Sequence, residues 1–114
     1  MVTIVGGDVV LCDLSFVIGT EQAGVRPAVV LQIARTNAVS PHTIIGLFTI
    51  RFRRALLPSD VLISAGIGGL SQDSIVFCEQ IRVIDKCRII RILAHLDNTY
   101  REEITRALRT ILGL

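Results

Sequence analysis

The sequence predicts an α+β fold that is mostly β, with five to seven short strands and one amphipathic helix at the C-terminus. Isoleucine and valine number 16 and 12 against 13 leucines, and β-branched side chains favour strands. A sustained helical spacing of apolar residues appears only near the end of the chain. The 114 residues suffice for one domain, 1–114, and their 51% hydrophobic and 19% charged content excludes a disordered protein.

The first two predicted strands flank a polar loop. Residues 8–13 form an apolar run that opens after two glycines, and residues 28–32 form a second run. The glycine-bearing segment 15–25 lies between the two runs and predicts a loop. Arg26-Pro27 leads into the second run, where a proline is tolerated because its missing N–H falls before the hydrogen-bonded ladder.

Further strands are predicted through the middle of the chain. Residues 33–41 predict an irregular segment or a single helical turn, which a Ser-Pro pair ends. The almost wholly apolar segment 43–50 predicts a strand that is buried on both faces. Residues 61–63 predict a short strand, and three glycines after it mark a turn. Residues 74–78 and 80–84 predict either one long bent strand or two consecutive strands.

The C-terminal segment predicts a helix. Thr99 and Glu102 form a capping-box pattern, although Asp97 or Asn98 serves equally well as the N-cap. Gly113 is placed where a glycine ends a helix. The predicted apolar stripe consists of Tyr100, Ile104, Ala107, Leu108 and Ile111. A shorter helical turn is also expected within residues 87–92.

The positive charge is almost entirely arginine, because eleven of the twelve cations are arginine and one is lysine. The planar guanidinium matches phosphate and stacks on bases, although codon bias or ordinary surface pairing explains the composition equally well. Arg51, Phe52, Arg53 and Arg54, here called the arginine cluster, combine charge with an aromatic ring. This combination is typical of single-stranded nucleic acid binding, and also of a basic loop that protects a hydrophobic strand.

Cysteine and histidine usage predicts neither a metal nor a cofactor. Cys12, Cys78 and Cys87 form no CxxC pair, and His42 and His95 do not complete a zinc site of sensible spacing. The odd number of cysteines suggests a reducing cytoplasm, and core or surface roles are expected for both histidines. No apolar run approaches the roughly 18 residues of a membrane span, so no membrane association is expected.

Three polar segments are candidates for a functional site. The loop 19–27 forms a polar pocket around an arginine held by the following proline, or only a hairpin loop with a Glu21–Arg26 ion pair. Thr49 ends the buried strand just before the arginine cluster, where strand propensity alone also favours threonine. Residues 79–86 alternate polar and apolar side chains, as an ordinary half-exposed strand does.

Together these segments carry a set of motifs in a fixed order. The motifs are Gly7-Asp8-Val9, Gly19-Thr20-Glu21-Gln22-x-Gly24-x-Arg26-Pro27, Thr49, Leu57-Pro58, Glu79-Gln80-Ile81-Arg82-x-Ile84-Asp85-Lys86 and His95-Leu96. In this order the chain resembles the MazF/PemK family of toxin endoribonucleases, or mRNA interferases, of type II toxin–antitoxin systems. The resemblance is collinear over residues 6–114, and it is specific because two long motifs occur in combination.

The resemblance implies an SH3-like small barrel of antiparallel strands (CcdB/PemK-like) and a homodimer. It also implies sequence-specific, metal-independent cleavage of single-stranded RNA, and a cognate antitoxin that blocks the RNA groove. The same fold also hosts non-catalytic toxins that bind a protein target such as DNA gyrase, which is the alternative prediction. A toxin of that kind does not need the family's catalytic arginine and threonine, which match Arg26 and Thr49 of this chain. The endoribonuclease is therefore favoured over the non-catalytic toxin.

Site residues follow from the resemblance by position. Arg26 and Thr49 correspond to the catalytic arginine and threonine of the family, and Glu21 is our candidate for the general base. The predicted RNA-binding residues are Phe16, Thr20, Gln22, Arg51, Phe52, Arg53, Arg54, Gln80 and Arg82. The chain departs from the usual pattern at Phe16, Ile33, Ala34, Leu47 and Ile50. Because these positions border the RNA groove, the cleavage preference of the family is not carried over.

Overall fold

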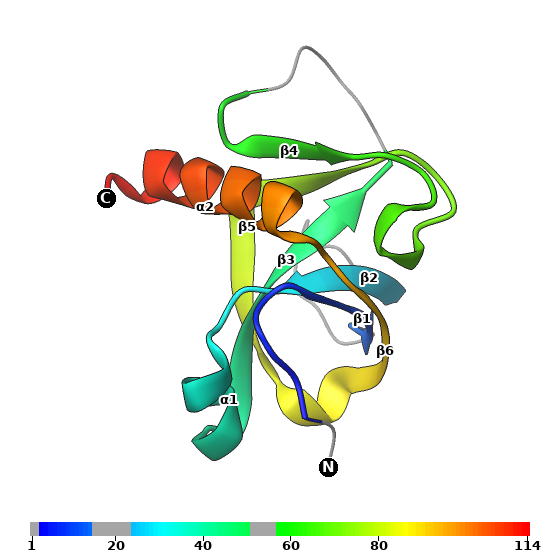
Figure 1. Cartoon of the computed structure of the whole chain (residues 1–114). Coiled ribbons are helices and arrows are strands. Elements are labelled where there is room, and N and C mark those ends of the chain that lie inside the picture. The colour runs from blue at the N-terminus through cyan, green and yellow to red at the C-terminus, as the bar shows by residue number, and fades with distance from the viewer. Residues whose placement is uncertain (1–2, 15–23, 51–56) are drawn as a thin grey trace.

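The computed structural model describes residues 3–14, 24–50 and 57–114, and it is shown in Figure 1. Within these residues the strands form one antiparallel six-stranded sheet in the order β4-β5-β3-β2-β1-β6. The strands are β1 (Asp8–Asp13), β2 (Val25–Val30), β3 (His42–Thr49), β4 (Asp60–Ile63), β5 (Ser74–Asp85) and β6 (Ile89–His95). The helices are α1 (Ala34–Val39) and α2 (Asn98–Leu112), with 3₁₀ turns η1 (Ile67–Gly69) and η2 (Lys86–Arg88). The predicted class is confirmed, although β4 and β6 are the edges of a sheet that does not close into a barrel.

The sheet has an apolar core on each face. Successive strand residues point to opposite faces, so Val9 and Val10 of β1 belong to different cores. Figure 1 shows α2 lying across β4 and β5, where Ile104 and Ala107 are buried on the helix side. The helix-side core includes Val9, Val29, Phe48, Val61, Ile63, Leu70, Val76, Cys78 and Leu96. The second core consists of Ile4, Val10, Cys12, Leu14, Ala28, Val30, Ile45, Leu47, Ile84 and Ile89.

The C-terminal helix begins and ends at residues that the sequence marks. Of the three possible N-caps, the structure selects Asp97, whose carboxylate accepts a hydrogen bond from the Tyr100 backbone N–H at 3.3 Å. Gly113 has a positive φ of 71° and ends the helix, as predicted. The predicted stripe is confirmed except at its last member, because Ile111 is exposed.

Strand β5 is one long strand with an irregularity in its middle, which decides between the two predicted alternatives. Gly46 of β3 pairs with Ile81, but Phe48 pairs with Val76, so β5 carries extra residues between these two positions. The first part of β5 pairs with both β4 and β3, whereas the second part, Ile81 to Asp85, pairs only with β3. As a result, the first part of β5 contributes side chains to the helix-side core and the second part contributes to the second core.

The helical turn predicted within residues 87–92 is wrong beyond its first residues. Only η2 is helical, and β6 begins at Ile89 and pairs with β1. Consecutive isoleucines allow both a helical and a strand interpretation. Pairing with β1 decides for the strand, because β1 would otherwise be an open edge along a buried core.

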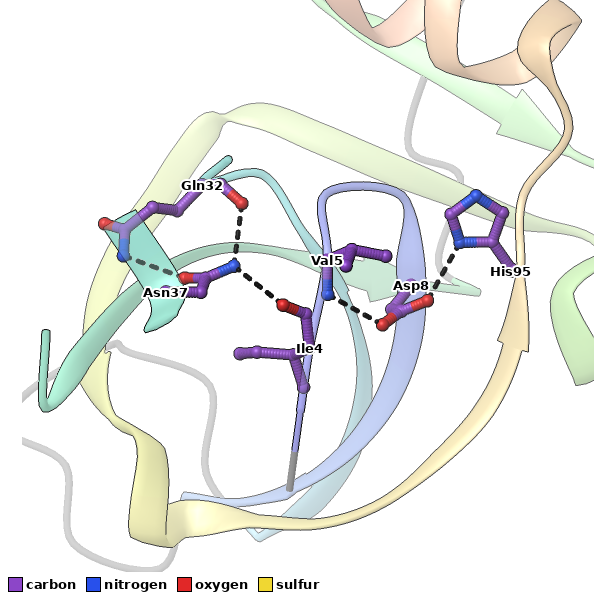
Figure 2. A network of polar contacts seen from close by, with 6 residues as sticks. All are labelled: Ile4, Val5, Asp8, Gln32, Asn37 and His95. Atoms are coloured by element: carbon purple, nitrogen blue, oxygen red, sulfur yellow. Dashed lines mark hydrogen bonds and ion pairs between the residues drawn. The ribbon is translucent and has the colours of Figure 1, made fainter. Parts of the chain in front are cut away.

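Asn37 of α1 is the centre of a buried polar network that holds the N-terminal segment (Figure 2). Its side-chain amide donates to the carbonyl oxygens of Gln32 (2.8 Å) and Ile4 (3.4 Å). Its amide oxygen accepts from Gln32 Nε2 and from Thr43 Oγ1, each at 2.8 Å. Lys86 Nζ donates to the backbone carbonyl of Asn37. One residue therefore joins four segments of the chain.

We expect Asn37→Ala to lower the free energy of unfolding by about 2–3 kcal/mol, because it leaves several buried polar groups without partners. Asn37 is only 3% exposed, so water does not replace the lost hydrogen bonds. Urea denaturation monitored by circular dichroism measures the effect. Thr36→Ala on the exposed side of α1 is the matched control, and an equal loss in both variants would contradict a central role for Asn37.

A second polar contact joins β1 and β6, the first and last strands along the chain. Figure 2 shows the Asp8 carboxylate between the Val5 backbone N–H (2.9 Å) and His95 Nδ1 (2.8 Å). The Leu96 backbone N–H donates to the Gly7 carbonyl beside this contact. His95 therefore has the structural role that its sequence context predicts.

Candidate active site

Arg26 and Thr49 are brought together at one end of the sheet by the register of β2 and β3. Ala28 of β2 pairs with Leu47 of β3. Continuing this antiparallel register by two residues along both strands brings Arg26 opposite Thr49. Pro27 lies just before the first residue of β2 that pairs with β3, where its missing N–H removes no hydrogen bond from that ladder.

Both side chains belong to the face of the sheet that carries the second core. Arg26 is two residues before Ala28 and Thr49 two residues after Leu47, and both of these apolar residues lie in the second core. Arg26 is half-buried, whereas Thr49 is only 9% exposed. On the edge of β2 that faces away from β3, Arg26 pairs with the buried Cys12 of β1. The guanidinium and the hydroxyl therefore stand at the rim of an apolar core.

Arg82 lies on the same face, although it comes from β5. It pairs with Ile45 of β3, a member of the second core. Burial raises the pKa of the Cys12 thiol to about 11, and the charge of Arg82 acts in the opposite direction. Cys12 is the ladder partner of Arg26 and a member of the second core. Arg26, Thr49 and Arg82, three of the predicted site residues, thus share one side of the sheet.

The remaining predicted residues are less closely associated with this group or lie outside the described residues. Gln80 is exposed on β5, in the segment where the register with β3 shifts. Residues 15–23 and 51–56 are outside the part of the chain that the structure describes. The predicted residues in those segments are Phe16, Thr20, Glu21, Gln22, Arg51, Phe52, Arg53 and Arg54. The first segment precedes β2 and the second follows Ile50, so both join the chain at the sheet end that holds Arg26 and Thr49.

A groove of about 380 Å³ lies at the same end of the sheet. Residues 24–27 at the start of β2 form one side, together with Phe48 and Ile50 at the end of β3. The segment 69–74 forms the facing side, and Leu11 and Leu93 complete the lining. The glycines of this segment predict a turn, and Ser74 opens a predicted strand. Gln72 itself belongs to none of the motifs that the sequence offers.

The thiols of the described chain are held in the protonated form. Burial, and next the charge of Asp60, raise the pKa of the Cys78 thiol to about 11. The hydrogen bond with the Asp85 carboxylate raises the pKa of the exposed Cys87 thiol. The backbone N–H of Cys87 donates to the same carboxylate and lowers the pKa of Asp85. The neighbouring Lys86 and Arg88 therefore do not make Cys87 a reactive thiolate.

Among residues 3–14, 24–50 and 57–114, no three His, Cys, Asp or Glu side chains gather in a way that suits a metal ion. In the same part of the chain, no helix has the length and apolar character needed to cross a membrane.

The chemistry available at this end of the sheet is recognition of an anion. Guanidinium groups donate two parallel hydrogen bonds to phosphate or carboxylate, and a half-buried position strengthens them. Thr49 adds a hydroxyl that both donates and accepts. The fold is that of a small, mostly β protein, and the guanidinium and hydroxyl groups at the ends of β2 and β3 are its candidates for binding an anion.

Comparison with known proteins identifies the family. Residues 6–112 match the family described as the PemK-like, MazF-like toxin of type II toxin–antitoxin systems. Endoribonuclease EndoA of Bacillus subtilis (strain 168) is 42% identical over 108 residues, which cover 95% of this chain and 93% of that protein. The chain therefore belongs to the PemK-like, MazF-like toxin family, and the family predicted from its sequence motifs is confirmed.

Solved structures agree with this assignment. MazF from Deinococcus radiodurans superposes with a TM-score of 0.82 at 26% identity, over 100% of both chains. A mycobacterial endoribonuclease, solved in complex with its cognate antitoxin, has a TM-score of 0.79 and covers 97% of this chain and 96% of its own. At 22% identity, the second match shows the fold alone. The predicted class of toxin endoribonuclease agrees with the names of these relatives.

Proposed function

We propose that this chain is a toxin endoribonuclease that forms one catalytic domain over residues 1–114 and cleaves single-stranded RNA, including mRNA, in a sequence-specific manner. The observation that carries this proposal is the pairing of Ala28 with Leu47 in the β2–β3 register, whose extension by two residues sets Arg26 opposite Thr49. The 42% identity to a protein named endoribonuclease supports the same activity.

Metal-independent cleavage of RNA uses the 2′-OH of the substrate as the nucleophile. The 2′-oxygen loses its proton and forms a bond to phosphorus, while the bond to the 5′-oxygen breaks and that oxygen takes up a proton from water. The products are a 2′,3′-cyclic phosphate and a 5′-OH. Arg26 stabilises the negative charge that gathers on the non-bridging oxygens in the transition state. Its place just before Pro27 limits its backbone freedom, so the guanidinium is oriented before the substrate binds.

Thr49 and Glu21 have the roles of positioning and proton transfer. The Thr49 hydroxyl is too weakly acidic to act as a base near neutral pH, so it orients the phosphate through a hydrogen bond. Glu21 is the proposed general base that removes the 2′-OH proton. Its segment joins β2 directly before Gly24, which supports its association with Arg26.

RNA binding extends from the catalytic pair along both flanking segments. Phe16 and Phe52 stack bases, and the arginines of the arginine cluster bind phosphates. Thr20, Gln22 and Gln80 provide further hydrogen bonds. Arg82 adds a second guanidinium on the face that carries Arg26, as its pairing with Ile45 supports.

The proposed partners are RNA, a cognate antitoxin peptide and a second copy of the chain, with the cytoplasm as the location. A solved relative in complex with its cognate antitoxin supports the antitoxin. Leu62, Val83 and Ile90 are between 42% and 61% exposed, and such apolar exposure on a small domain supports homodimerisation.

We expect the purified protein to cut a long unstructured RNA at discrete sites in the presence of EDTA. Sequencing of the fragment ends, with chemical identification of the termini, should give 2′,3′-cyclic phosphates and 5′-hydroxyls. Fragments with 5′-phosphates, or cleavage that requires added magnesium, would contradict the proposed mechanism. If a folded, toxic protein cuts no RNA, the proposed function is wrong and a protein target such as DNA gyrase becomes the next candidate.

A further inference from the structure

The groove beside Arg26 has an apolar floor and one polar wall. Leu11, Pro27, Phe48, Leu70 and Leu93 contribute its apolar surface, and Val25 and Ile50 stand at the strand ends with 56% and 55% of their surface exposed. Its polar wall is formed by Ser71, Gln72 and Ser74. Flat apolar surface with hydrogen-bonding groups along one edge is the environment that suits a heteroaromatic ring.

The polar wall belongs to a loop, residues 64–73, that is fixed by its own hydrogen bonds. The Asp73 carboxylate accepts from the Ala65 backbone N–H at 2.7 Å, and the Gly66 N–H donates to the Leu70 carbonyl at 2.8 Å. Leu70 is 7% exposed and anchors the loop in the helix-side core. The Ser74 hydroxyl donates to the Gln72 carbonyl at 3.0 Å and fixes the backbone at the wall.

Gly68 shows how closely this loop packs on the sheet. Its φ is +65°, and a Cβ at this position would lie 3.1 Å from Val9 Cγ2 and 3.2 Å from Leu96 Cδ2. The backbone of a loop held in this way needs no further ordering when a ligand binds. The backbone of the polar wall is therefore in place before any ligand arrives.

The side chain of Gln72 is available to a ligand. Gln72 is exposed and lines the groove. Its side-chain amide makes no hydrogen bond to any residue that the structure describes, since only its backbone carbonyl accepts one. An amide offers a donor and an acceptor side by side, which is the pairing that reads the edge of a base.

Arg26 connects the groove with the face of the second core. It belongs by alternation to the face of the second core, yet it also lines the groove together with its neighbours Val25 and Pro27. A nucleotide that crosses this end of the sheet then has its phosphate at the guanidinium and its base in the groove.

We propose that this groove is a nucleobase subsite in which the Gln72 amide reads the edge of a base next to the cleaved phosphate. The inference rests on the proposed endoribonuclease function and assigns part of its sequence preference to the loop 64–73. Ser71 provides a secondary hydrogen bond at the rim, whereas Ser74 is buried and holds the Gln72 carbonyl.

Gln72→Ala and Gln72→Glu test the subsite with RNA that is randomised in sequence and whose cut ends are sequenced. We expect Gln72→Ala to relax the base preference at a single position by about 5–150-fold, which is the range for the loss of one two-bonded contact to a base. Gln72→Glu has only acceptors, so it should shift that position toward bases that present an amino or imino donor. Thr36→Glu on α1, outside the lining of the groove, controls for the added charge.

The outcomes separate the inference from the proposed function. Unchanged preference at every position in folded Gln72 variants overturns the inference, as does an equal loss of rate on all sequences. A change confined to dimerisation or antitoxin binding also overturns it and makes the groove a protein interface. If the wild-type protein cuts no RNA, the proposed function fails and the subsite fails with it. If Arg26→Ala alone is inactive while both Gln72 variants cut with wild-type preference, only the subsite is wrong.

Discussion

Arg26→Ala should lower the rate of RNA cleavage by about 10²–10³-fold or more, because it removes the donors that stabilise the charge on phosphorus in the transition state. Arg26 lies opposite Thr49 by register and is half-buried, so water does not replace its bidentate hydrogen bonds fully. Single-turnover cleavage of a fluorescent RNA that contains one mapped site measures the rate. Arg26→Lys keeps the charge but loses the planar fork, and we expect it to recover only part of the activity.

The control for this substitution is Arg35→Ala, because Arg35 is an exposed arginine on α1. Circular dichroism and sedimentation should show that the Arg26 and Arg35 variants keep the fold and the assembly of the wild-type protein. A folded Arg26→Ala variant that cuts RNA at the wild-type rate would remove Arg26 from the catalytic site.

Replacing Arg51, Arg53 and Arg54 together by glutamine should weaken RNA binding and flatten its salt dependence. For single strands, each phosphate contact contributes a slope of about 0.7 in the plot of log affinity against log salt, so three contacts contribute about 2. Fluorescence anisotropy in the Arg26→Ala background, measured between low and moderate salt, gives the slope without cleavage of the probe.

A second triple variant provides the matched control for charge. Arg35, Arg106 and Arg109 are exposed on α1 and α2, and their replacement by glutamine removes the same formal charge from other surfaces. An identical slope for the two triple variants, or an unchanged slope for the arginine-cluster variant, would place the RNA-binding surface elsewhere.

The positions of most strands along the chain and the C-terminal helix were predictable because local patterns and global packing agree over most of this chain. Thr43 to Thr49 is apolar and β-branched, and the strand that it forms is indeed buried between β2 and β5. Gly113 ends α2 because its positive φ of 71° is inexpensive only for glycine. Residues 89–95 resisted prediction because their isoleucines fit either period, and a partner some eighty residues earlier decides between them.

The sequence motifs nominate residues for the candidate site but not the geometry that relates them. The motifs identify Arg26, Thr49 and Arg82, but only the pairing of Ala28 with Leu47 and of Ile45 with Arg82 brings them to one face. Gln72 carries no motif signal, because its relation to Arg26 arises from the path of the loop 64–73 over the sheet. Contacts of this kind depend on long-range register, and short-range sequence patterns do not encode them.

The pairing of β1 with β6 makes completion of the sheet depend on both ends of the chain. Asp8 and His95 are 87 positions apart, and β1 obtains its second neighbour only when β6 has been made. At about 5–20 residues per second, a ribosome reaches His95 roughly 4–17 s after Asp8. Until then one side of β1 has no partner strand, and Ile89 of β6 is missing from the second core. We therefore expect the sheet to be completed only near the end of synthesis.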